Sequence, residues 1–104
     1  MIKALKPCES EIAKFPEGIR EDIADLLIRL EFGQTLSLPI SRPMPNIGKR
    51  VHESRLTDRG GEYRLIYMIV GAENIWLIHA FKKQSQKTPL KQIQVCKNRL
   101  KQIV

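Results

Sequence analysis

The chain has 104 residues, a hydrophobic content of 42% and a formal net charge of +7, which predict one folded, basic domain over residues 1–104. This composition excludes a disordered tail. No apolar run approaches the length of a membrane span, and Met1–Glu11 lacks the long apolar core of a signal peptide. We therefore expect a cytoplasmic protein with no membrane partner.

Cysteine usage fits that expectation. Cys8 and Cys96 form no CxxC motif and have no neighbouring histidine ligands in the sequence. We expect both to be free thiols that pack as small apolar groups, with no metal site and no cofactor.

The excess positive charge lies entirely at the C-terminal end of the chain. Residues 1–81 contain 11 Lys or Arg and 11 Asp or Glu, whereas residues 82–104 contain six Lys, one Arg and no acid. A block of one sign indicates a surface for a polyanion or an acidic protein, but it also fits a solvated helix face. The charge pattern alone does not choose between these interpretations.

The N-terminal third predicts one short strand followed by two helices. Met1–Lys6 fits a first strand, and Glu9–Lys14 fits a short helix. A longer helix is predicted to begin at Pro16 and to end near Gly33, because proline suits a first turn and glycine suits the position after a helix. Its apolar stripe recurs at helical spacing: Ile19, Ile23, Leu26, Leu27 and Leu30.

The middle of the chain predicts an antiparallel meander. Leu38–Gly48 contains three prolines and a glycine, and we expect it to be a loop or a set of turns. Three strand-like runs follow, separated by two connections of hairpin length. The runs are Val51–Thr57, Glu62–Val70 and Asn74–Phe81, and the connections are Asp58–Gly61 and Gly71–Asn74.

A basic helix is predicted to close the chain, with Thr88 as its N-cap and Pro89 at its first position. Its narrow apolar stripe consists of Ile93, Cys96, Leu100 and Ile103. The element order predicts an α+β domain with its helices on one face of the sheet.

Arg64 is the most unusual residue of the predicted strands, because it lies in the middle of an apolar run. Burial of an unpaired charge is costly, so Arg64 must either meet a carboxylate or face a wet cleft. An ion pair with Glu53 or Glu62 is the structural alternative to a functional role. Strand alternation places Arg55 on the same face as Glu53.

No strong enzyme motif is present, and His52 and His79 are the only histidines. His79 lies in a predicted strand, where a hydrogen-bonded core role is favoured over catalysis. Tyr63, Tyr67 and Trp76 are expected in the core, with base stacking as the alternative. Arg and Lys side chains can bind a phosphate and stabilise charge that develops on it, and an RNA substrate can supply its own 2′-OH nucleophile.

Several segments of the sequence resemble those of a known protein family. "YRLIY" (Tyr63–Tyr67), "IHAFKKQSQKTP" (Ile78–Pro89) and the lysine-rich closing helix resemble the RelE/ParE toxin superfamily, in particular its phage-derived HigB-like branch. "FPEGIRED", "RPMPNIG" and "DRGGEYR" fit the same branch. The resemblance spans nearly the whole chain.

The resemblance implies a small RelE-like α+β fold, with two N-terminal helices packed on an antiparallel sheet of about four strands plus a C-terminal basic helix. It also implies the toxin of a type II toxin–antitoxin system, with a cognate antitoxin and mRNA on the ribosome as partners. The implied activity is metal-independent endoribonuclease cleavage by 2′-OH attack. The alternatives are a ParE-type toxin that inhibits DNA gyrase without cutting nucleic acid, and an inactive binding module.

The resemblance also implies site residues. The catalytic candidates are Arg55, Arg64, Lys82 and Lys83, and the RNA-binding candidates are Lys49, Arg50, Arg59, Lys87 and Lys91. Glu53 departs from the family pattern, because some relatives have a lysine at this strand position.

Overall fold

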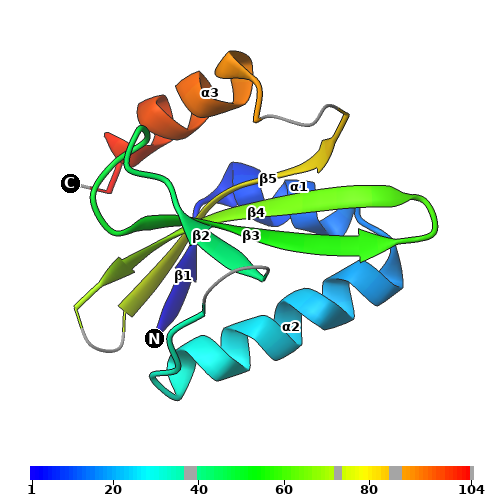
Figure 1. Cartoon of the computed structure of the whole chain (residues 1–104). Helices are drawn as coiled ribbons and strands as arrows, with labels where there is room; N and C mark the ends of the chain where they lie inside the picture. The colour runs from blue at the N-terminus through cyan, green and yellow to red at the C-terminus, as the bar shows by residue number, and fades with distance from the viewer. Residues whose placement is uncertain (37–39, 72–73, 85–87, 104) are drawn as a thin grey trace.

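The computed structural model describes residues 1–36, 40–71, 74–84 and 88–103. Figure 1 shows one sheet with α1 and α2 on one face and α3 on the other. The elements are β1 (Ile2–Ala4), α1 (Lys6–Ala13), α2 (Glu17–Glu31), β2 (Ser41–Pro43), β3 (Val51–Asp58), β4 (Gly61–Val70), β5 (Asn74–Lys83) and α3 (Leu90–Leu100). In the described residues, no helix is both long enough and apolar enough to cross a bilayer.

The sheet is five-stranded, in the order β1-β5-β4-β3-β2. The predicted meander of β3, β4 and β5 is confirmed, and each strand pairs antiparallel with the next. β1 runs parallel to β5, so the sheet is mixed and has one strand more than expected.

The extra strand is β2, which lies in the segment predicted to be only loop. Ser41–Pro43 pairs antiparallel with β3 at the edge of the sheet. Proline is tolerated there, since an edge strand leaves one row of backbone groups without a ladder partner. α1 also starts earlier than predicted, at Lys6, because Pro7 occupies its first turn.

The prediction that all helices cover one face is wrong. Leu65 and Ile66 are neighbours on β4 and therefore point to opposite faces, yet both are fully buried. Each face of the central strands must consequently be covered. α2 buries Ile19 and Ile23 against one face, and α3 covers the other face, where it buries Cys96 (Figure 1).

The two helices predicted to begin at a proline each begin one residue later than predicted. Pro16 and Pro89 are the N-cap residues of α2 and α3, and neither helix has a side-chain cap. The predicted N-cap, Thr88, instead uses its hydroxyl in a contact with the sheet. Gly33 has a φ of 81°, as expected for the glycine that follows a helix end.

A polar lock joins α1, β5 and α3, formed by Glu11, His79 and Arg99. β1 covers β5 only at Ile75–Leu77, which leaves the outer edge of β5 open beyond it. There Glu11 Oε1 accepts from the backbone N–H of Ala80 at 3.1 Å. Arg99 donates to the carbonyl of Ile78 at 3.0 Å and to both carboxylate oxygens of Glu11 at 2.8 and 2.9 Å. The lock therefore protects a strand edge that would otherwise be exposed.

His79 belongs to this lock, which confirms the core interpretation of this residue. It is buried, and its two ring nitrogens contact Glu11 and Gln92. Arg99 is one of the seven cations of the C-terminal block, and its guanidinium is held by Glu11 in a bidentate pair.

Candidate functional site

Three cations from the central strands share one face of the sheet. Arg55 on β3 lies directly opposite Arg64 on β4, and Lys83 on β5 lies directly opposite Glu62 on β4. Residues that lie opposite each other in an antiparallel pair point to the same face, and so do residues two apart on one strand. Arg55, Arg64 and Lys83, called here the cationic cluster, therefore occupy the face on which α3 lies.

Arg64 is the buried member of the cluster, with a side chain that is 2% exposed. Its Nη1 donates to the carbonyl of Tyr63 at 3.2 Å and its Nη2 to Glu62 Oε2 at 3.4 Å. Among the described residues, Nε has no hydrogen-bond partner; Glu53 Oε1 lies 3.6 Å away, an ion-pair distance that is too long for a hydrogen bond. The expected ion pair with Glu53 or Glu62 is thus present with both acids.

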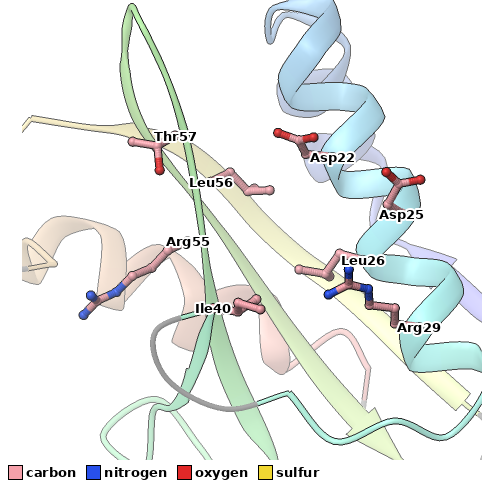
Figure 2. Close-up of a pocket in the computed structure, with 8 residues that line it drawn as sticks. All are labelled: Asp22, Asp25, Leu26, Arg29, Ile40, Arg55, Leu56 and Thr57. Carbon is pink, nitrogen blue, oxygen red and sulfur yellow. The ribbon is translucent and has the colours of Figure 1, made fainter.

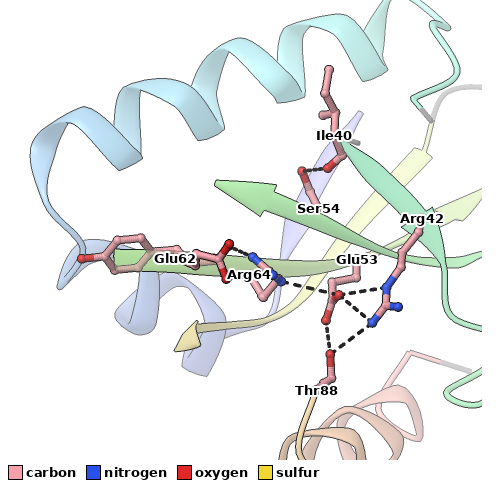
Figure 3. Close-up of polar contacts among 8 residues, drawn as sticks. Ile40, Arg42, Glu53, Ser54, Glu62, Arg64 and Thr88 are labelled. Carbon is pink, nitrogen blue, oxygen red and sulfur yellow. Dashed lines mark hydrogen bonds and ion pairs between the residues drawn. The ribbon is translucent and has the colours of Figure 1, made fainter. Parts of the chain in front are cut away.

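Glu53 is a fully buried carboxylate that connects four segments of the chain (Figure 3). Besides Arg64, Arg42 on β2 donates to Glu53 Oε1 through Nε at 3.1 Å, and its Nη2 lies 3.1 Å from the same oxygen. Thr88, just before α3, donates to Oε2 at 2.6 Å. A buried polar group is costly unless it is hydrogen-bonded or paired, so these contacts fix Glu53 in place.

The cluster remains positive despite its acids. Burial lowers the pKa of Arg64, while the carboxylates of Glu53 and Glu62 act in the opposite direction. Partial burial and then repulsion from Arg64 lower the pKa of Lys83. With Arg42 included, four cations face two carboxylates, which leaves a formal excess of two positive charges.

A hollow of about 320 Å³ lies behind the cluster, between α2 and the β2–β3 side of the sheet. Asp22, Asp25 and Arg29 of α2 line one wall, and Ile40 and Leu56 line the other (Figure 2). The guanidinium of Arg55 points away from α2 in this view. Arg55 is thus among the residues that line the hollow, but its guanidinium lies on the other side of β3 from α2.

Lys82 does not join the cationic cluster. It lies opposite Tyr63, on the other face of the sheet, and its Nζ is 5.8 Å from the centre of the Tyr63 ring. Lys82 and Lys91 together line a hollow of about 220 Å³ between the end of β5 and the start of α3. This arrangement separates Lys82 from Lys83, which was expected to act with it.

Three of the RNA-binding candidates, Lys49, Arg50 and Arg59, lie on turns at the surface. Lys49 and Arg50 precede β3, and Arg50 has a φ of 63°, an uncommon value for a residue other than glycine. Arg59 lies in the β3–β4 turn. Lys91 is exposed on α3, and Lys87 lies outside the described residues. These side chains remain candidates for contacts with an RNA backbone.

The sequence did not single out Arg42 or Thr88. Arg42 stands in the proline-rich segment whose short strand was not predicted, and its contact with Glu53 depends on the β2–β3 pairing. Thr88 was assigned to the helix cap. In neither case does the local pattern carry a signal for the contact.

The sequence matches the model of the family described as "Phage derived protein Gp49-like (DUF891)" over residues 10–101. No curated protein matches the chain.

The fold is similar to solved structures of an E. coli toxin. The isolated RelE toxin aligns over 100% of this chain and 98% of that chain, with 18% identity and a TM-score of 0.57. RelE with two arginine-to-alanine substitutions, in the free state, aligns over 100% and 97%, with 16% identity and a TM-score of 0.53. The intact E. coli RelBE toxin–antitoxin complex aligns over 82% and 98%, with 16% identity and a TM-score of 0.49. The first two similarities identify a RelE-like fold.

Proposed function

The chain belongs to the Gp49-like family of phage-derived proteins, and on that premise we propose that it is the toxin of a type II toxin–antitoxin pair that cleaves mRNA on the ribosome. The RelE-like fold supports the toxin role. The observation that carries the nuclease activity is the convergence of Arg55, Arg64 and Lys83 on one face of the central strands.

In this mechanism the RNA supplies the nucleophile. The ribose 2′-OH attacks the adjacent phosphorus, the bond to the 5′-oxygen of the next nucleotide breaks, and a cyclic phosphate and a free 5′-hydroxyl result. Lys83 and Arg64 hold the scissile phosphate. Arg55, which is exposed, stabilises the negative charge that the phosphate gains in the transition state.

Such a site gains most of its rate from alignment. A cluster of cations stabilises charge but does not by itself place the 2′-OH in line with the leaving oxygen. The ribosome would supply that alignment by holding the message in one conformation. Lys91 and Arg59 are exposed and would bind backbone phosphates without reading sequence.

The partner that restrains such a toxin would be a cognate antitoxin with an acidic segment. The basic C-terminal block attracts a segment of opposite charge. Arg99 is already engaged by Glu11, so Lys91, Lys97 and Lys101 are the described cations of this block that α3 and its end present to a partner.

Mapping of mRNA 5′ ends after induction tests this proposal. Wild-type protein should arrest growth and create new 5′ ends within translated messages. Arg55→Ala/Lys83→Ala should fold, because both side chains reach solvent, and should not cleave, because Arg64 is then the only cation left in the cluster. Lys6→Ala/Lys14→Ala removes the same charge elsewhere on the surface and should cleave like the wild type.

Other outcomes of the same experiment reject the nuclease proposal. Growth arrest with unchanged 5′ ends would point to gyrase inhibition, and supercoiling of a reporter plasmid would then be measured. Normal growth with soluble protein would leave an inactive binding module.

A further inference from the structure

One of the site's own acids covers Arg64, and we infer that Glu62 competes with the phosphate that the cationic cluster binds. This inference rests on the proposed function, since it concerns the same site. It assigns a role to an acidic residue that the mechanism above does not use.

The two acids that contact Arg64 differ in how firmly they are held. Glu53 is fully buried and also receives Arg42 and Thr88, so it is part of the permanent structure. Glu62 has a side chain that is 53% exposed, and its hydrogen bond to Arg64 Nη2, at 3.4 Å, is at the outer limit of length. Only Glu62 can therefore leave Arg64 at low cost.

The burial of Arg64 makes that departure necessary. With 2% of its side chain exposed, Arg64 has almost no surface that a phosphate could reach while Glu62 lies beside Nη2. Glu62 also lies directly opposite Lys83, the second residue assigned to the phosphate. A phosphate that binds Arg64 and Lys83 together would take the place of the Glu62 carboxylate.

The exchange is favourable for a phosphate. A phosphate offers a guanidinium two parallel hydrogen bonds, whereas Glu62 receives one long bond. Because each bound phosphate must first displace Glu62, the apparent affinity for RNA falls by the fraction of molecules in which the site is open. Glu62 thus sets a threshold that favours RNA already held in place over free RNA.

Binding of a fluorescein-labelled single-stranded DNA oligonucleotide to the full chain tests the inference, because DNA lacks the 2′-OH and is not cut. Fluorescence anisotropy at fixed salt gives Kd for the wild type, Glu62→Gln and Glu31→Gln. Glu31→Gln removes one exposed negative charge from the end of α2 and is the matched control. We expect Glu62→Gln to bind about threefold to fivefold more tightly than the wild type, and more tightly than the control.

The same measurement in an Arg64→Gln background separates displacement from general charge. If Glu62 acts by covering Arg64, the gain from Glu62→Gln disappears when Arg64 carries no charge. A gain of the same size in both backgrounds, or equal Kd values for Glu62→Gln and Glu31→Gln, would overturn the inference. Should Arg64→Gln not fold, as judged by circular dichroism, Lys83→Ala serves as the second background. Arg64 keeps its charge there, so the gain from Glu62→Gln should persist; its loss would mean that Glu62 acts on Lys83, which lies opposite it, and would overturn the inference.

Failure here is distinct from failure of the nuclease proposal. The oligonucleotide reports anion binding alone, whereas 5′-end mapping reports cleavage in cells. Tighter binding by Glu62→Gln without any mRNA cleavage would keep Glu62 as a competitor and reject the reaction.

Discussion

Arg55 and Arg64 lie directly opposite each other on β3 and β4, so two like charges share adjacent positions on one face of the sheet. Like charges in directly opposite positions destabilise a sheet. Lys83 adds a third cation, and repulsion from Arg64 helps to lower its pKa. The protein therefore keeps a charge arrangement that works against folding, which is typical of a functional site.

Replacement of Arg55 should separate stability from toxicity. Arg55 is exposed, so Arg55→Ala removes the repulsion without opening a cavity, and we expect the free energy of unfolding to rise by about 0.5 kcal/mol. Toxicity on induction should fall, because the transition-state charge loses a cation. Urea unfolding and growth curves measure the two effects. Lys14→Ala, at the C-cap of α1, should change neither. If Arg55→Ala destabilises the fold, the repulsion argument is wrong; if it stays fully toxic, Arg55 has no part in cleavage.

Glu53 should matter more for stability than any surface acid. Glu53→Gln keeps the size of the side chain but leaves Arg42 and the buried Arg64 without the Glu53 carboxylate. We expect the free energy of unfolding to fall by about 3 kcal/mol, as when one partner of a buried ion pair is removed. Urea unfolding of Glu31→Gln, an exposed acid on α2, should differ little from the wild type. An equally small effect for Glu53→Gln would mean that the network contributes nothing to folding.

Local patterns were sufficient to predict the meander and the faces of its strands. Alternation placed Arg55 with Glu53, and the isolated charge of Arg64 in an apolar run predicted a carboxylate partner. In the structure Arg64 forms ion pairs with both of the expected partners, Glu53 and Glu62. These features depend on residues a few positions apart or on neighbouring strands, so the sequence contains the signal.

Contacts between distant segments could not be predicted in this way. Glu53 and Thr88 are separated by 35 positions, and nothing near either residue indicates that they meet. β2 has only three residues and exists because β3 offers it an edge. The separation of Lys82 from Lys83 was not predicted either: β5 continues to Lys83, two residues beyond the predicted end, so alternation sends Lys82 and Lys83 to opposite faces.

The two cysteines should resist alkylation in the folded protein. Burial raises the pKa of Cys8 and of Cys96 to about 12, so almost no thiolate exists at pH 8. Native protein treated with iodoacetamide at pH 8 should keep its mass, and protein unfolded in guanidinium chloride should gain two carbamidomethyl groups. Rapid labelling of native protein would show that α1, which carries Cys8, or α3, which carries Cys96, opens in the folded state.

Acid should weaken the lock between α1, β5 and α3. Burial alone would raise the pKa of Glu11, but hydrogen bonds from His79, Arg99 and the Ala80 backbone outweigh it and lower that pKa to about 2 from an ordinary value of 4.5. A carboxylate with a lowered pKa in the folded state stabilises the protein above its unfolded pKa, and this contribution is lost as the pH falls from 4.5 towards 2.

Comparison of the wild type with Glu11→Gln isolates this contribution. We expect the variant to be less stable at pH 7 by about 2 kcal/mol, a value reduced for the partial exposure of Glu11. The difference in the free energy of unfolding should stay constant from pH 7 to about 5. It should then shrink as the pH approaches 2, because protonation of Glu11 makes the wild type resemble the variant. Urea unfolding at pH 7, 4.5 and 2.5 measures the difference in the free energy of unfolding between the two proteins. Only a charged Glu11 holds Arg99 and the edge of β5 in a pH-dependent way. A difference that does not change with pH would therefore mean that Glu11 acts through packing.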